Sequence, residues 1–139
     1  MTDPVIIEVP VNVRDLPGPN FRGNWGKHHR LKAQARLTAA WAWAGAGKPR
    51  FDGPVVVDVL MVYPAPRLDD DNETGACKTI RDGIFSGNAT PDDSHRWVRY
   101  GTVGWAEGAR PYVRFTIRRD DGEAGEALQA VQRGQGPAR

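Results

Sequence analysis

The sequence has very little cysteine and no long hydrophobic run, and each shortage excludes a class of protein. Its one cysteine, Cys77, cannot form an intrachain disulfide, which excludes a disulfide-stapled domain. The N-terminus has no basic segment leading into an apolar one, so we expect no signal peptide and a reducing, cytoplasmic setting. The longest apolar stretches, residues 39–46 and 55–62, are far shorter than the roughly 20 residues of a membrane span. No membrane role is expected.

Negative charge is also missing from a long part of the chain. No Asp or Glu occurs between Leu16 and Phe51, although the whole chain has a net charge of only +2. Beyond this stretch the sign reverses, with four acids among residues 69–73. A phosphate-binding surface beside a metal-binding pocket needs such segregation, but a solvated basic helix face explains the first stretch equally well. The stretch carries these basic residues: Arg22, Lys27, Arg30, Lys32, Arg36, Lys48 and Arg50.

Length and periodicity predict one small domain of mixed secondary structure. A chain of 139 residues is ordinary for one domain, which we place at residues 1–119. Residues 120–139 contain four glycines and no sustained apolar pattern, which predicts a flexible tail. We expect an α/β (α+β) fold of two layers, with two main helices packed against a small mixed sheet. The elements are expected at Val5–Val9 (strand), 27–44 (helix), Val55–Tyr63 (central strand), 70–85 (helix), 97–105 and 112–118 (strands).

The first expected helix divides into a packing side and a charged side. Apolar and small residues spaced three or four apart would share the packing side: Leu31, Ala35, Thr38 and Ala42. His28 is expected to join the charge on the opposite side, which consists chiefly of His29, Lys32 and Arg36. One side therefore packs while the other presents positive charge.

The second expected helix carries a narrow polar stripe. At about 100° per residue, Lys78 and Asp82 lie within about 20° of Asp71, and Gly75 lies about 40° from it. Asp70 projects elsewhere, at about −100°, and is left outside the site. The far side should pack, and Cys77 is therefore interpreted as structural, together with Ala76, Ile80 and Ile84.

Carboxylates gather at both ends of this helix in the sequence. Asp69 precedes it at the end of the central strand, and Asp92 and Asp93 follow it in a loop. Clustered carboxylates repel one another unless a positive charge lies between them, and hard oxygen ligands suit Mg²⁺ or Mn²⁺. A divalent ion held there could activate water and neutralise phosphate charge, as phosphodiester hydrolysis requires.

Two simpler explanations compete with a metal site. Asp70, Asp71 and Asn72 could be ordinary helix-start residues, which satisfy free N–H groups and complement the helix dipole. An EF-hand loop beginning at Asp70 is the other alternative, but its twelfth position is Arg81 instead of Glu. His95 is expected to be a surface histidine, and the tryptophans are expected to be core or dimer contacts more often than base-stacking residues.

Three segments of residues 67–96, taken together, resemble the RusA-type Holliday junction resolvases, a family of crossover junction endodeoxyribonucleases from phages and prophages. The first is Asp69-x-Asp71-Asn72 after a strand, and the second is Lys78-x-x-x-Asp82-Gly83 in a helix. The third is Pro91-Asp92-Asp93-Ser94 after a loop. Elsewhere only the order of the elements agrees with the family.

The resemblance implies a RusA-like fold and a magnesium-dependent endonuclease that resolves four-way DNA junctions by paired hydrolysis, in recombination and repair. It implies that Asp69, Asp71 and Asp93 bind Mg²⁺, with Mn²⁺ as a substitute, and that Lys78 supports catalysis. The compact form of the motif has its lysine at the position of Gly75, so Lys78 begins nearly one helical turn further along. A homodimer in the cytoplasm of a bacterial or phage-infected cell is implied too, without a small-molecule cofactor.

Two other functions remain open from the sequence. The displaced lysine is compatible with a structured-DNA binding module that has lost hydrolysis, and a nuclease for flaps or forks is the other alternative. In each case the DNA backbone is expected to contact the basic stretch. The residues predicted to bind DNA are Arg22, Lys27, Arg30, Lys32 and Arg36.

Overall fold

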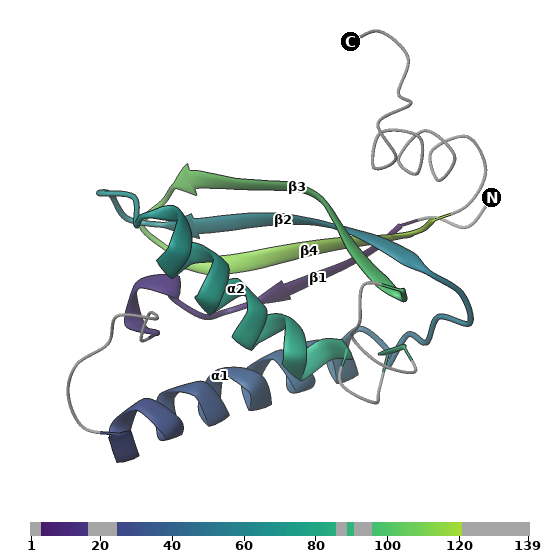
Figure 1. Cartoon of the computed structure of the whole chain (residues 1–139), viewed down its shortest axis with the longest axis horizontal. Coiled ribbons are helices and arrows are strands. Elements are labelled where there is room, and N and C mark those ends of the chain that lie inside the picture. The colour runs from purple at the N-terminus through teal and green to yellow at the C-terminus, as the bar shows by residue number, and fades with distance from the viewer. Residues whose placement is uncertain (1–3, 17–24, 86–88, 91–95, 121–139) are drawn as a thin grey trace, which may run out of the picture.

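The computed structural model describes residues 4–16, 25–85, 89–90 and 96–120, shown in colour in Figure 1. The predicted tail after Asp120 therefore lies outside the described residues. Among those that are described, no helix is both long and apolar enough to cross a membrane. In chain order the elements are β1 (Val5–Val9), the 3₁₀ helix η1 (Val13–Asp15), α1 (Trp25–Gly45), β2 (Val55–Tyr63), α2 (Asp70–Ile84), β3 (Val98–Glu107) and β4 (Tyr112–Arg119).

The strands form one four-stranded sheet in the order β1-β4-β2-β3. β4 pairs antiparallel with β1 and with β2, whereas β2 and β3 run parallel, so the sheet is mixed. β2 is an inner strand, and all of its residues except Asp58 and Leu60 are buried. The continuous apolar run of this strand had predicted that position.

Both helices lie on the same side of the sheet, as Figure 1 shows. Side chains that point toward them from β4, namely Val113, Phe115 and Ile117, are buried and alternate with half-buried ones. They join one core cluster with residues of β1, β2, α1 and α2. The predicted two-layer fold is thus confirmed.

The other face of the sheet carries charged pairs, and neither of the described α-helices covers it. Arg114 of β4 binds Glu8 of β1 at 2.9 Å, and Arg118 lies 3.5 Å from Asp58 of β2. Asp58 also accepts a hydrogen bond from the backbone N–H of Thr102 at 2.8 Å. These contacts tie neighbouring strands together on the face that lies away from α1 and α2.

The parallel pair requires a long connection, because a tight turn can join only antiparallel strands. α2 supplies that connection by crossing back along the sheet between the end of β2 and the start of β3 (Figure 1). The first turn of α2 therefore lies near one end of the sheet and its last turn near the other. The observed helix bounds lie within two residues of the predicted ones, and β3 extends two residues further than expected.

The two helices touch where Gly83 of α2 meets α1. A methyl group at Gly83 would overlap the carbonyl oxygen of Arg36 and would lie 2.8 Å from the Cβ of Ala39. The side chains of Ala39 and Ile80 are fully buried nearby in the same core. Gly83 therefore sets how closely the helices approach.

Gly83→Ala should lower the free energy of unfolding by about 1–3 kcal/mol, because the added methyl forces the helices apart. Urea denaturation followed by circular dichroism measures this change. Gly45→Ala is the matched control, since a methyl group there would meet nothing within 4 Å. Equal stability of the two variants would contradict the close contact at Gly83.

Candidate active site

Asp69 caps the first turn of α2. Its backbone is extended, and its Oδ1 accepts a hydrogen bond from the N–H of Asn72 at 2.8 Å. Asp70, Asp71 and Glu73 follow within the first turn, where negative charge complements the helix dipole. The helix-start explanation, made for Asp70, Asp71 and Asn72, therefore holds for the acids of the first turn, and the capping residue itself is Asp69. Capping does not exclude a second role, because a carboxylate has two oxygens and the cap engages one of them.

The polar stripe of α2 is exposed at Asp71 and Lys78 and half-buried at Gly75 and Asp82. Asp69, Asp71 and Lys78 are all exposed to solvent. Lys78 begins seven residues after Asp71, which is about 10 Å along the helix axis. The opposite side packs into the core through Ala76, Cys77, Ile80 and Ile84.

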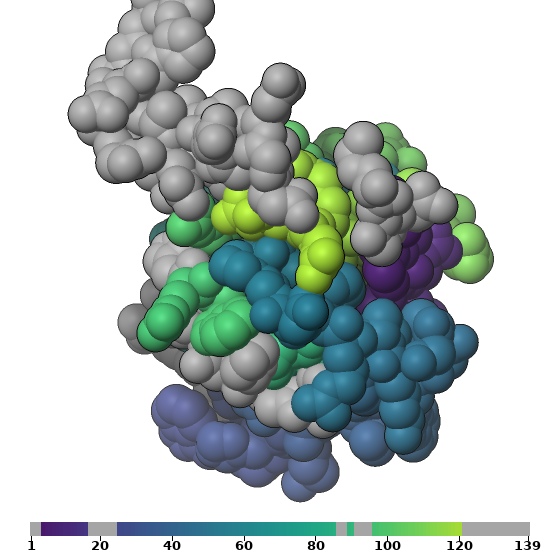
Figure 2. Space-filling model, turned by 90° about the vertical axis from the view of Figure 1, so that its right-hand side faces the viewer, coloured from purple at the N-terminus to yellow at the C-terminus, as the bar shows by residue number. Residues whose placement is uncertain are grey.

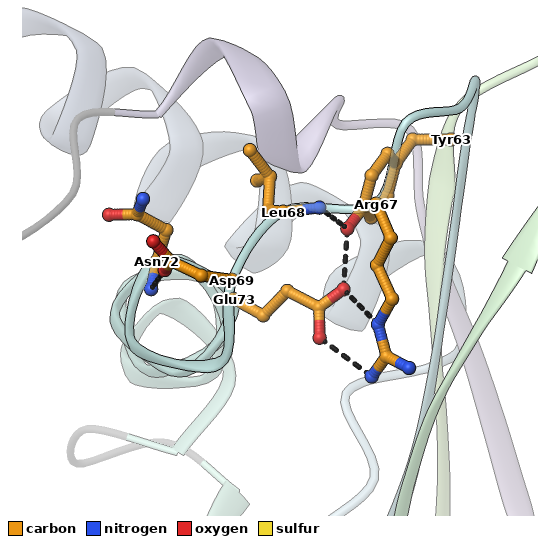
Figure 3. A network of polar contacts seen from close by, with 6 residues as sticks. All are labelled: Tyr63, Arg67, Leu68, Asp69, Asn72 and Glu73. Atoms are coloured by element: carbon orange, nitrogen blue, oxygen red, sulfur yellow. Dashed lines mark hydrogen bonds and ion pairs between the residues drawn. The ribbon is translucent and has the colours of Figure 1, made fainter.

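Glu73 is the acid of this segment that the sequence reasoning missed. Its side chain is buried and accepts hydrogen bonds from Nε and Nη2 of Arg67, at 3.0 and 2.9 Å, and from the hydroxyl of Tyr63 (Figure 3). At about 100° per residue Glu73 falls on the packed side of α2, close to Ile80. That position alone signals a buried carboxylate that needs a positive partner.

The network around Glu73 is electrically balanced. Burial, together with the hydrogen bond to Glu73, raises the pKa of Tyr63 to about 12. The Tyr63 hydroxyl therefore stays protonated across the physiological range and donates a hydrogen bond to Glu73. The same carboxylate raises the pKa of Arg67, chiefly through its hydrogen bonds.

Asp93 lies outside the described residues, but the chain on both sides of its segment is described. The N–H of Phe51 donates to the carbonyl of Ala89, and the N–H of Val55 donates to the carbonyl of Trp97, each at 2.8 Å. Trp97 is thereby tied to the first residue of β2, and Ala89 is tied to the segment just before that strand. Figure 2 views this end of the molecule, where the segment before β2 (blue) lies beside the start of β3 (green) and the end of β4 (yellow-green).

The flanks of the Asp93 segment and the two described acids thus lie at opposite ends of α2. Asp69 and Asp71 are at its start, and its 15 residues span about 22 Å. Among the described residues, no three His, Cys, Asp or Glu side chains gather as a metal-ligand group. The described part of the chain brings Asp69 and Asp71 together at the start of α2.

In comparisons with known proteins, the chain matches no family model and no curated protein.

The basic residues of α1 are spread around the helix and do not form one outward face. Lys27, Arg30 and Arg36 are exposed, but Lys32 is half-buried beside the packed side, so its predicted place opposite that side was wrong. Arg22 lies outside the described residues. At about 100° per residue, Arg30 shares the outward side with Leu37 and Trp41, so that side is partly apolar.

The packed side of α1 is also rotated from the predicted one. Burial there is greatest at His28, Ala35, Ala39 and Trp43, and the predicted Leu31, Thr38 and Ala42 flank them as half-buried residues. The expectation that His28 joins the charged face was wrong. Burial lowers the pKa of His28, and the positive charge of Lys32 and the ring of His29 act in the same direction.

Substitutions at Asp69 can separate its capping role from any role in chemistry. Asp69→Ala removes the cap and should lower the free energy of unfolding by about 1 kcal/mol, whereas Asp69→Asn retains an acceptor for the N–H of Asn72 and should change it by only a few tenths. Urea denaturation of both variants measures the difference. Equal losses in the two variants would show that the cap does not stabilise α2.

Proposed function

We propose that the protein is a metal-dependent endonuclease that cuts branched DNA, as the resemblance to RusA-type junction resolvases implies. The observation that carries the proposal is the pair Asp69 and Asp71. Both carboxylates face solvent in one helical turn, directly after the link that follows an inner strand. Carboxylates at the carboxyl end of a strand in an α/β sheet are placed where ligands bind in such folds.

The donor set fits a hard divalent cation. Asp69 and Asp71 offer exposed carboxylate oxygens, which are the ligands preferred by Mg²⁺ and Mn²⁺. Mg²⁺, when bound, would supply an activated water and neutralise charge on the phosphodiester. In this proposal Asp69 and Asp71 bind the ion and fix its position. The ammonium group of Lys78, on the same stripe of α2, stabilises negative charge that develops on the phosphate.

The topology favours a homodimer as the active form. A third carboxylate from Asp93 would have to reach Asp69 and Asp71 from a part of the chain whose described flanks are hydrogen-bonded near the start of β2, at the far end of α2. A second copy related by a two-fold axis can place the start of one α2 beside the far end of the other. We therefore propose that Asp93 of one subunit completes the site of its partner. Such a pair of sites suits a four-way junction, whose resolution needs two symmetric cuts.

Asp71→Asn should abolish Mg²⁺-dependent cleavage of an end-labelled four-way junction and leave binding of that junction intact. A matched linear duplex and an EDTA lane serve as controls. A fork substrate in the same gel separates a junction resolvase from a fork nuclease. If the wild type shifts the junction but cuts nothing with Mg²⁺ or Mn²⁺, the protein is a binding module and the nuclease proposal is wrong.

The same assay tests the shared site when Asp71→Asn is mixed with Asp93→Asn. If the acids come from different subunits, each mixed dimer regains one intact site. Nicking should then return to about a quarter of the wild-type rate, because half of the dimers are mixed and each of these has one intact site of two. If both acids come from one subunit, every site in the mixture is damaged and no nicking returns.

Arg30→Gln combined with Arg36→Gln should weaken junction binding and reduce the slope of log affinity against log salt by about two, because two phosphate contacts are lost. Fluorescence anisotropy between low and moderate salt measures both quantities in EDTA. Arg114→Gln removes a charge on the opposite face of the sheet and should change neither. An unaltered slope in the double variant would place the DNA elsewhere.

A further inference from the structure

We infer that Glu73, Tyr63 and Arg67 are positioning residues that hold Asp69 in place for metal binding, an inference that rests on the proposed function. Asp69 ends a link, residues 64–69, that belongs to neither β2 nor α2. The position of its carboxylate therefore depends on contacts outside the sheet ladder. The network of Figure 3 supplies those contacts.

The network fixes the backbone immediately before and after Asp69. The N–H of Leu68 donates to the hydroxyl oxygen of Tyr63, the last residue of β2, at 2.9 Å. One helical turn later, the N–H of Glu73 donates to the carbonyl of Asp69 at 3.0 Å. The side chain of Glu73 then returns to Tyr63 and to Arg67, which closes a ring of contacts around the link.

The carboxylate of Glu73 is suited to this task because separation from its hydrogen-bond partners would raise the free energy of the folded state. Its side chain is 4% exposed, and a buried carboxylate without partners is strongly unfavourable. Arg67 offers two parallel N–H donors, and its guanidinium lies 6.0 Å from the ring centre of Trp105. The Trp105 ring also lies 5.8 Å from that of Tyr63, so the three partners are packed together.

Glu73 does not share a ligand position with Asp69. In Figure 3 its side chain extends toward Arg67 and Tyr63, while Asp69 and Asn72 lie on the other side of the helical turn. It therefore acts on Asp69 through the backbone. Asp70 projects away from the polar stripe and Glu73 is engaged by Arg67 and Tyr63, so Asp69 and Asp71 are the acids of residues 69–73 that are left to bind a cation. Glu73 holds them in position relative to the end of β2.

Amide hydrogen exchange tests the inference without any metal. The N–H of Leu68 reports its bond to Tyr63, and the N–H of Asn72 reports the carboxylate of Asp69 at the cap. In Tyr63→Phe and in Glu73→Gln, both amides should exchange roughly tenfold faster while amides of β1 and β4 keep their rates. Glu8→Gln alters an exposed Glu–Arg pair on the other face of the sheet and should leave both amides protected.

Paramagnetic broadening by Mn²⁺ then tests the link to the site. Mn²⁺ should broaden the resonances of Asp69 and Asp71 in the wild type and in Glu8→Gln, and at least fivefold more Mn²⁺ should be needed in Tyr63→Phe and Glu73→Gln. Unchanged exchange of Leu68 and Asn72, or unchanged broadening, would overturn the positioning role. Faster exchange throughout the sheet would also overturn it, because it would show a general loss of stability. If Mn²⁺ leaves the wild type unbroadened, the proposed function is wrong, and the exchange rates still decide whether the network holds Asp69.

Discussion

The parallel pairing of β2 with β3 is the constraint on which the rest of the structure depends. Two adjacent parallel strands start at the same end of a sheet, so the chain must return along the whole sheet between them. α2 makes that return and buries one side against the core as it does so. Its start is thereby held at the end of β2, and its end is held near the start of β3. The positions of Asp69 and Asp71 follow from this arrangement.

The same carboxylates can serve the fold and the proposed chemistry without conflict. Asp69 caps α2 through one oxygen, and the acids of the first turn complement the positive end of the helix dipole. A helix start stabilises negative charge that would otherwise repel itself, so the acids can gather there before any cation arrives. Glu73, one residue beyond Asn72, is neutralised by Arg67 instead.

Much of this arrangement could be predicted because periodicity reports burial directly. The apolar run of β2, the alternation of β4 and the polar stripe of α2 each have one dominant period. α1 was harder, since alanines occupy both its packed and its outward sides, and the placement of His28 and Lys32 failed for that reason. The helical period places Glu73 on the packed side of α2, but it does not identify the partner, because Arg67 lies in the link, where no period applies. The distance between Asp71 and the flanks of the Asp93 segment depends on which strands pair in parallel, and the order of elements alone does not give it.

The lengths of α2 and β2 are linked, because α2 has to return along the sheet between β2 and β3. The 15 residues of α2 span about 22 Å, while the nine residues of β2 span about 30 Å. One added turn would lengthen α2 by about 5.4 Å, and β2 would need nearly two more residues to match that added length. In the proposed dimer, a two-fold axis would repeat every such change in the second subunit. In each subunit the length of α2 would then fix how far Asp69 and Asp71 lie from the described flanks of the Asp93 segment.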